Sequence, residues 1–263
     1  MLRQHSSIHL IFSFLSGIVL LFILAPLLRL LLAPGIDGLL GAISDEKISH
    51  SIAFTLLMAM LTTLVTGLFV VPFAWLMARS HFRFKALINA MIDLPVMIPH
   101  SAAGIALLGI INRESLLGQW TSSMGINFVD RPAGIAIAMA FVSLPYLFNA
   151  SRDAFASVPL HFEKAAMNLG SNRWKTFLYI SLPLAGRGIL SGYVLMFGRA
   201  MSEFGAIIII AYHPMVTPVM IFDRFNAFGL SSAQAVAALF VLISLIVFVT
   251  LRLLTKTQTD ARN

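Results

Sequence analysis

The sequence predicts an all-α integral membrane protein that crosses the bilayer with six transmembrane helices. Hydrophobic residues make up 59% of the 263 residues and charged residues only 11%, whereas a soluble domain carries about 25% charged residues. The mean hydropathy is +0.90, so too few polar residues are available to cover a surface in water. The apolar residues gather in long runs without the alternation of strands. Because a helix satisfies its own backbone groups in lipid, these runs are predicted to be helical.

Six apolar segments are each about as long as the ~20 residues that a helix needs to cross the hydrocarbon. They cover residues 10–28, 52–78, 86–111, 133–150, 188–211 and 233–251. The first segment follows Arg3 and resembles a signal peptide in position. Its apolar run is longer than the roughly 7–15 residues of a signal sequence, so we expect it to be retained as a helix.

The basic residues of the connections predict how the chain is oriented in the membrane. Twelve Lys and Arg residues lie in one set of connections together with both ends of the chain, and four lie in the other set. Since positive residues are enriched on the cytoplasmic side, both termini are expected in the cytoplasm of a multi-pass protein of the cell (plasma or inner) membrane. The formal net charge of +7 does not indicate nucleic acid as a partner, because short basic clusters between apolar runs favour a membrane surface.

The fourth connection, residues 151–187, is the longest and contains the polar stretch EKAAMNLGSNRWKTFLYISLP. Its apolar residues recur at helical spacing. Pro159 is suited to open a short helix, and Gly170 is suited to end it in a left-handed cap. A second helix from Trp174 would then lead to Pro183. We therefore expect a helix, a turn and another helix at the cytoplasmic face of the membrane.

The spacing within this stretch resembles the cytoplasmic EAA loop of binding-protein-dependent ABC importer permeases. That pattern is Glu-Ala-Ala, three residues, Gly, nine residues, Ile, one residue and Leu-Pro. Lys164 stands where the pattern has Glu, and Glu163 lies one residue earlier, so a carboxylate that anchors the loop would have to make a shifted contact. The resemblance implies an ATPase-coupling loop made by Glu163, Lys164, Ala165, Ala166, Gly170, Ile180, Leu182 and Pro183. Spacing alone leaves an ordinary amphipathic connector as the alternative.

Two further stretches, DLPVMIPHSAAGIALL (residues 93–108) and GRAMSEFGAIIIIAYHPM (residues 198–215), are similar to segments of molybdate/tungstate permease subunits, which have sulfate permeases as near relatives. The resemblance covers most of the chain after the first helix. It implies a type I ABC importer permease fold, a homodimer, and a tetrahedral oxyanion, molybdate or tungstate, as the substrate. Sulfate or thiosulfate remains the alternative.

We divide the chain accordingly into three parts. Residues 1–50 hold the first transmembrane helix and an external loop, residues 51–254 form the permease core with the coupling loop, and residues 255–263 form a polar cytoplasmic tail.

Polar residues and prolines inside the predicted spans are candidates for a translocation path or its gate. Arg199, near the middle of the fifth segment, lies four residues before Glu203, and a charge at a helix centre costs about 2.5–3.5 kcal/mol. Either the two charges neutralise each other and fix the helix, or Arg199 attracts an oxyanion while Glu203 keeps its binding weak. Pro95 and Pro99 would bend the third segment. The candidate residues are Pro95, Pro99, His100, Ser101, Arg199, Ser202 and Glu203.

The source of energy is expected to lie outside this chain. No G-x-x-x-x-G-K-[ST] motif and no Gly-Lys pair occur, so we predict no catalytic residue, metal site or bound cofactor. By the resemblance, two cytoplasmic ABC ATPase subunits would hold ATP and Mg²⁺, and an external oxyanion-binding protein would deliver substrate to two copies of this chain. A secondary transporter is the less favoured alternative, because we recognise neither inverted repeats nor a coupling-ion site. An intramembrane enzyme would need convergent acid–base or metal-binding groups.

Overall fold

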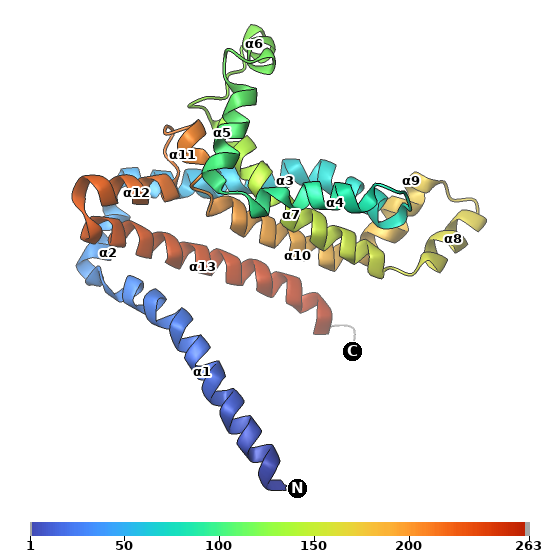
Figure 1. Cartoon of the computed structure of the whole chain (residues 1–263), viewed down its shortest axis with the longest axis horizontal. Coiled ribbons are helices and arrows are strands. Elements are labelled where there is room, and N and C mark those ends of the chain that lie inside the picture. Colours follow the sequence, from blue (N-terminus) through green and yellow to red (C-terminus); the bar gives the residue numbers. More distant parts are fainter. Residues whose placement is uncertain (1, 261–263) are drawn as a thin grey trace. The chain divides into compact units, whose positions relative to one another are not determined.

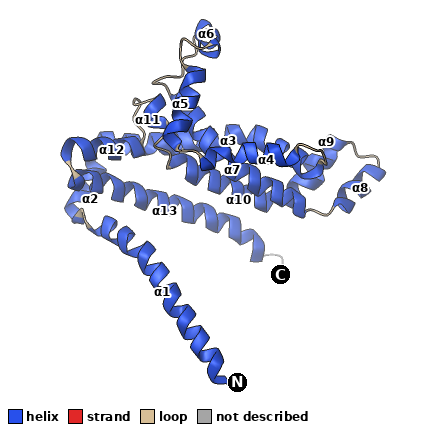
Figure 2. Ribbon diagram, viewed as in Figure 1, coloured by secondary structure: helices blue, strands red, loops and turns tan. Residues whose placement is uncertain are grey.

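The computed structural model describes residues 2–260, and the side chains of residues 8–253. Within this part of the chain every regular element is a helix (Figures 1 and 2). The elements are α1 (Leu2–Leu32), α2 (Gly35–Ser44), α3 (Glu46–Arg79), α4 (Lys85–Met97), α5 (His100–Ile111), α6 (Leu116–Ser123), α7 (Pro132–Ser157), α8 (Leu160–Asn168), α9 (Arg173–Thr176), the π-helical η1 (Phe177–Ser181), α10 (Leu182–Met201), α11 (Ile207–Ile210), α12 (Thr217–Phe228) and α13 (Leu230–Asp260).

Five stretches of helix are long and apolar enough to cross a membrane, and each overlaps a predicted segment. They are Ile8–Leu32, Glu46–Arg79, Pro132–Ser157, Arg173–Met201 and Leu230–Leu253. The remaining predicted segment, residues 86–111, corresponds to α4 and α5, which add a sixth span if the pair is counted as one. The predicted all-α membrane fold is therefore confirmed. Helix α13 continues to Asp260, well into the predicted polar tail, whose last three residues lie outside the described part.

The chain divides into two compact units, residues 1–50 with 220–243 and residues 51–219 with 244–263. In the smaller unit, Asp45 precedes α3 and accepts hydrogen bonds from the amide of Lys47 at 2.9 Å and from Arg224 Nη2 on α12 at 2.8 Å. Burial raises the pKa of the Asp45 carboxyl, but the bonds from Arg224 and from the amides of Lys47 and Ile48 outweigh it and hold that pKa below its usual value. The charged form of Asp45 thus joins the start of α3 to α12.

The third predicted span is not a single kinked helix, because α4 and α5 meet at 111°. Helix α4 ends at Met97, Ile98 is extended, and Pro99 is the N-cap of α5. Proline lacks an N–H group and disfavours helical geometry in the residue before it, which explains the break at Ile98. Pro95 stays inside α4 and is buried. The predicted bend is therefore present as a break at Ile98 and Pro99, whereas Pro95 does not interrupt α4.

The fifth predicted segment, residues 188–211, also needs correction at both ends. Helix α10 ends at Met201 because the chain turns there, and the Glu203 carboxylate accepts the Ala206 amide at 2.8 Å inside that turn. Arg199 consequently lies in the last turn of α10 rather than near the middle of a span. At the other end, α9, η1 and α10 form one continuous helix from Arg173. The second helix predicted for the polar loop is therefore the beginning of the fifth span.

Helices α7 and α10 pack closely in the larger unit, where buried side chains such as Phe148, Phe155 and Met196 form the core. The close approach depends on small residues, as is common between helices in membranes. A Cβ atom added to Gly188 would lie 2.4 Å from Ala154 Cβ, whereas one added to Gly198 would meet no atom within 4 Å.

Gly188→Val is accordingly expected to destabilise the protein by about 1–3 kcal/mol, because it forces α7 and α10 apart. Gly198→Val, in the same helix, is the matched control and is expected to have a small effect. Thermal unfolding in detergent micelles measures the difference. Equal melting temperatures of the two variants would contradict the observed packing.

Candidate functional site

The predicted coupling loop folds as a short helix, a glycine turn and the start of the fifth span. Helix α8 follows its N-cap, Pro159, as predicted. Gly170 comes after the helix end with a φ of +91°, which is the left-handed conformation predicted for it and one that residues with a Cβ rarely adopt. Asn172 then caps α9 by accepting the Lys175 amide at 2.8 Å. The loop is thus an ordered hairpin of two helices.

Glu163 anchors this hairpin to the membrane helices. Its Oε1 atom accepts hydrogen bonds from Arg79 Nε at 2.9 Å, from Arg79 Nη2 at 2.8 Å and from Ser181 Oγ at 2.7 Å. Arg79 Nη2 also donates to the Val158 carbonyl at 3.0 Å. Glu163 is only 6% exposed, so these bonds are charge-assisted and shielded from water. Three elements, α3, α8 and η1, therefore meet at one carboxylate oxygen, and the anchoring contact is made one residue before the position of the usual pattern.

The other predicted loop residues are spread over both arms of the hairpin. Lys164 and Ala165 are exposed on α8, Ala166 and Ile180 are half-buried, Gly170 is exposed at the turn, and Leu182 and Pro183 occupy the first turn of α10. Of this set, the structure brings Glu163 next to Ser181, which directly follows Ile180. The exposed positions face away from the bundle and leave α8 free to contact another molecule.

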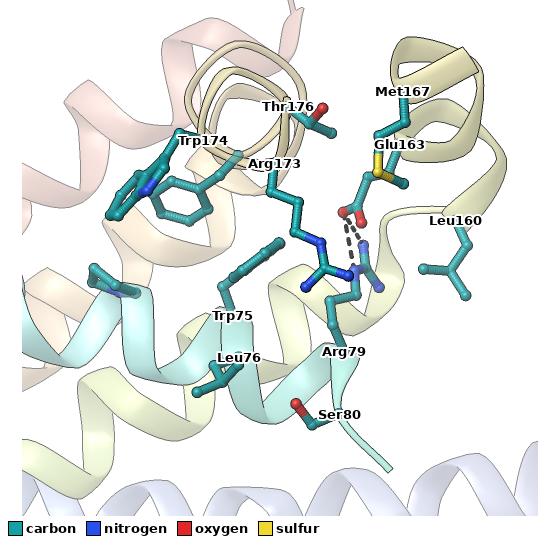
Figure 3. A pocket seen from close by; sticks show the side chains of 12 residues that line it. Trp75, Leu76, Arg79, Ser80, Leu160, Glu163, Met167, Arg173, Trp174 and Thr176 are labelled. Carbon is teal, nitrogen blue, oxygen red and sulfur yellow. Dashed lines mark hydrogen bonds and ion pairs between the residues drawn. The ribbon is translucent and has the colours of Figure 1, made fainter. Parts of the chain in front are cut away.

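A cavity of about 560 Å³ lies between the hairpin and the end of α3. Figure 3 shows the Arg79–Glu163 pair at this cavity, with the Arg173 side chain directed toward the pair. The Trp75 ring of α3 and the Trp174 ring of α9 lie at this cavity (Figure 3), and Phe177 of η1 also lines it. The Arg79–Glu163 ion pair thus joins α8 to α3 beside this space, while the Trp75 and Phe177 rings, whose centroids lie 5.2 Å apart, join α3 to η1.

By the resemblance to importer permeases, Gly170→Val is expected to abolish substrate uptake by the complex with the ATPase while the protein still inserts into the membrane. No atom lies within 4 Å of an added Cβ, so valine would cause no steric clash there. Its expected destabilisation of about 1–3 kcal/mol comes from the left-handed backbone conformation and affects the turn itself. Gly170→Asn is the matched control, because asparagine tolerates the left-handed region. Uptake is compared with membrane levels of each variant. Normal uptake by Gly170→Val would show that the turn does not transmit motion.

The second candidate site lies where α10 ends against the start of α5. Glu203 Oε2 is 2.5 Å from Arg199 Nη2 and 3.2 Å from His100 Nδ1. The same Arg199 nitrogen is 2.8 Å from His100 Nδ1, and Arg199 Nη1 donates to Ser202 Oγ at 3.2 Å. Glu203 is fully buried, whereas the Arg199 side chain is 16% exposed. The buried Glu203 carboxylate thus contacts Arg199 at the end of α10 and His100 at the start of α5.

The structure separates the remaining gate candidates. Pro99 and Ser101 are exposed at the first turn of α5 beside His100, while Pro95 is buried one turn earlier in α4. Asp93 of α4 accepts a hydrogen bond from Asn149 Nδ2 of α7 at 2.6 Å, so its observed contact is between helices.

Two important residues were not predicted from the sequence as part of a site. Arg79 was counted only as a positive charge of a connection, and Ser181 was passed over within the loop. Both are partners of Glu163. A basic residue at the last position of an apolar run and a hydroxyl just before Leu-Pro were the available signals, but their meeting depends on how α8 folds back.

Comparison with known families agrees with this geometry. The family described as binding-protein-dependent transport system inner membrane component matches residues 70–259. The chain belongs to this family. Its hairpin of α8 and α9 and most of its spans lie within the matched region, so the resemblance stated from the loop pattern is confirmed, and the chain is a multi-pass ABC permease of the membrane.

Several curated relatives are named as permeases for oxyanions. The molybdate/tungstate transport system permease protein WtpB of Thermococcus kodakarensis is 36% identical over 253 residues, which is 95% of this chain and 97% of the relative. The WtpB protein of Methanocaldococcus jannaschii is 36% identical over 89% of this chain and 92% of the relative. The sulfate transport system permease protein CysT of Escherichia coli is 31% identical over 78% of this chain and 75% of the relative.

Solved structures show the same fold at low sequence identity. A bacterial ABC transporter involved in import of the acidic polysaccharide alginate matches with a TM-score of 0.76 at 16% identity, covering 97% of this chain and 98% of its own. The MetNI methionine ABC transporter matches with a TM-score of 0.60 at 12% identity, covering 81% and 95% of the two chains.

Proposed function

We propose that this permease is the membrane-spanning subunit of an ATP-driven importer of molybdate or tungstate. The observation that carries the proposal is the 36% identity to a molybdate/tungstate permease over 95% of the chain. Two copies, with both termini in the cytoplasm, would enclose the translocation path around a two-fold axis. An external binding protein would deliver the oxyanion, and two ATPase subunits would hold ATP and Mg²⁺.

The hairpin of α8 and α9 supports the proposed coupling role. Its exposed residues, including Lys164 and Ala165, would dock on the ATPase, while buried Glu163 ties the hairpin to α3 through Arg79. Because the second arm continues into α10 without a break, a displacement of the hairpin would move the fifth span directly. Nucleotide-driven closure of two ATPases would thereby switch the helices between inward-facing and outward-facing arrangements.

The cluster of Arg199, His100 and Glu203 would act as part of the gate, together with Pro95, Pro99, Ser101 and Ser202. It ties the end of α10 to the start of α5, next to the break between α4 and α5. Glu203 would keep the attraction of Arg199 for a dianion weak, since a pathway must release what it binds.

Sulfate is the second candidate substrate, and the 31% identity to the sulfate permease CysT supports it. Reconstitution in liposomes distinguishes these possibilities. We expect the complete system of permease, ATPase and binding protein to accumulate radiolabelled molybdate or tungstate against a gradient, with an excess of sulfate competing poorly. Strong competition by sulfate would instead identify sulfate as the substrate. If the permease alone accumulated substrate against its gradient, driven by an ion gradient, the protein would be a secondary transporter and not part of an ABC importer.

A further inference from the structure

We propose that the cavity beside Glu163 binds one anionic phospholipid, with the phosphate at Arg173 and Arg79 and an acyl chain along α3. The cavity has about 560 Å³ and is lined by residues of α3, α8, α9 and η1. The proposal concerns a lipid ligand of the permease and does not depend on its transported substrate or on the ATPase.

The charges at the cavity favour an anion. Arg79 already shares the single negative charge of Glu163, and Arg173 is directed toward the same pair (Figure 3). No hydrogen bond or ion pair of the Arg173 side chain is found within residues 8–253. Two guanidinium groups therefore face one carboxylate, and one positive charge is left over. A phosphodiester suits this arrangement, because arginine binds phosphate through paired N–H groups.

A second polar group in the lining also lacks a partner. The Trp75 Nε1 atom is buried and makes no hydrogen bond. A buried N–H group without an acceptor is costly and uncommon in native structures. This atom has almost no accessible surface, so a ligand in the cavity would reach it only after the indole ring turned, and the lipid site rests on Arg173 and on the apolar lining.

The rest of the lining is apolar and matches an acyl chain better than a soluble anion. Pro72, Leu76, Met167, Trp174 and Phe177 all contribute to it. Pro72 lies seven residues before Arg79, so the lining follows α3 for about 10 Å from the guanidinium toward the middle of the span. Trp174 is 71% and Leu76 52% exposed, which leaves the cavity open at its side.

The position of the cavity fits the boundary of the bilayer. It lies at the end of α3 that leads into the basic connection of Arg79, Arg83 and Lys85, on the side of the chain with most of the Lys and Arg residues. Tryptophan is enriched at the level of lipid headgroups, and basic residues near a membrane surface attract anionic lipids. Indole rings, a free guanidinium and an apolar groove thus occur together at headgroup depth.

Quenching of tryptophan fluorescence by brominated lipids tests the proposal on the full chain in nanodiscs. The chain has three tryptophans, so Trp120→Phe leaves only Trp75 and Trp174, which both line the cavity. Brominated phosphatidylglycerol or brominated phosphatidylcholine is titrated into a zwitterionic bilayer. We expect half-maximal quenching at an about fivefold lower fraction of phosphatidylglycerol.

Variants separate the cavity from general surface charge. Arg173→Gln is expected to make the two titration curves coincide, whereas Arg173→Lys keeps part of the preference and controls for folding. Arg83→Gln removes the same charge from an exposed position outside the cavity and is expected to leave the preference intact. The proposal would be overturned if both lipids quenched the parent chain equally. It would also be overturned if Arg83→Gln and Arg173→Gln lost the preference for phosphatidylglycerol to the same extent.

Two further arms identify other occupants. Millimolar inorganic phosphate is expected not to relieve the quenching by phosphatidylglycerol, and relief would show that a soluble anion is the ligand instead. Addition of the ATPase subunit is likewise expected to leave the quenching unchanged. Its loss on assembly would assign the cavity to a protein partner and overturn the lipid site.

Discussion

Glu163→Gln is expected to lower substrate uptake by the assembled transporter at least about fivefold, because it weakens the coupling between the hairpin and the membrane helices. Glutamine has nearly the same shape as glutamate, but it cannot supply the charge that binds Arg79 Nε and Nη2. Arg79, whose side chain is only 13% exposed, would lose its counter-charge at a cost of about 2–3 kcal/mol. Uptake in proteoliposomes and ATP hydrolysis are measured together, since loss of coupling lowers the first more than the second.

Asp153→Asn provides the control for Glu163→Gln. Asp153 is also paired with an arginine, Arg152, but its side chain is 68% exposed, and exposed ion pairs contribute little. This variant is expected to transport normally. If both variants behaved alike, or if Glu163→Gln transported normally, the anchor would have no role in coupling.

Glu203→Gln is expected to destabilise the permease by about 3–5 kcal/mol, because it removes the only carboxylate in contact with Arg199 and His100 among the described residues. The amide of glutamine can still accept the Ala206 amide that Glu203 Oε1 accepts at 2.8 Å, so the loss reports on the charges and not on the turn. Thermal unfolding in detergent gives the change in stability.

The double variant Arg199→Gln, Glu203→Gln separates stability from transport. It leaves no uncompensated charge from the pair, so it is expected to recover most of the stability lost by Glu203→Gln. Uptake is expected to remain low, because the contact between α10 and α5 is lost. Recovery of both stability and uptake would reduce the Arg199–Glu203 pair to a structural one with no part in the gate.

The spans were predictable because hydropathy and length depend only on local composition. The residues at which these helices end were less predictable wherever a contact with a residue far away in the sequence determines the end. The break at Ile98 follows from Pro99, yet Pro95 and Pro99 are both helix-breaking residues in the sequence and only the structure shows that Pro95 stays helical. Likewise, α10 ends at Met201 where Glu203 turns inward to hold Arg199 and the Ala206 amide. Apolar residues continue through that turn, so composition alone extended the segment to residue 211.

The loop pattern identified the hairpin because its signals, a proline before the helix and a glycine after it, are local. Its anchor was not identifiable in the same way. Arg79 and Glu163 are separated by 84 residues, and the pair forms only because α8 folds back onto the end of α3. The shift from Lys164 to Glu163 was visible in the sequence, but the contact that explains it was not.

Site-directed cross-linking shows whether α8 of this permease docks on a separate ATPase at the cytoplasmic face, as we propose. The chain has no cysteine, so a single cysteine can be placed at exposed Lys164 on α8 or at Leu116, which is 89% exposed on α6. We predict that Lys164→Cys cross-links to the ATPase with a yield that changes on ATP binding, and that Leu116→Cys does not. Labelling of Lys164→Cys by an impermeant reagent from outside intact cells, or cross-linking of the ATPase through Leu116→Cys instead, would place α8 on the wrong side of the membrane for coupling.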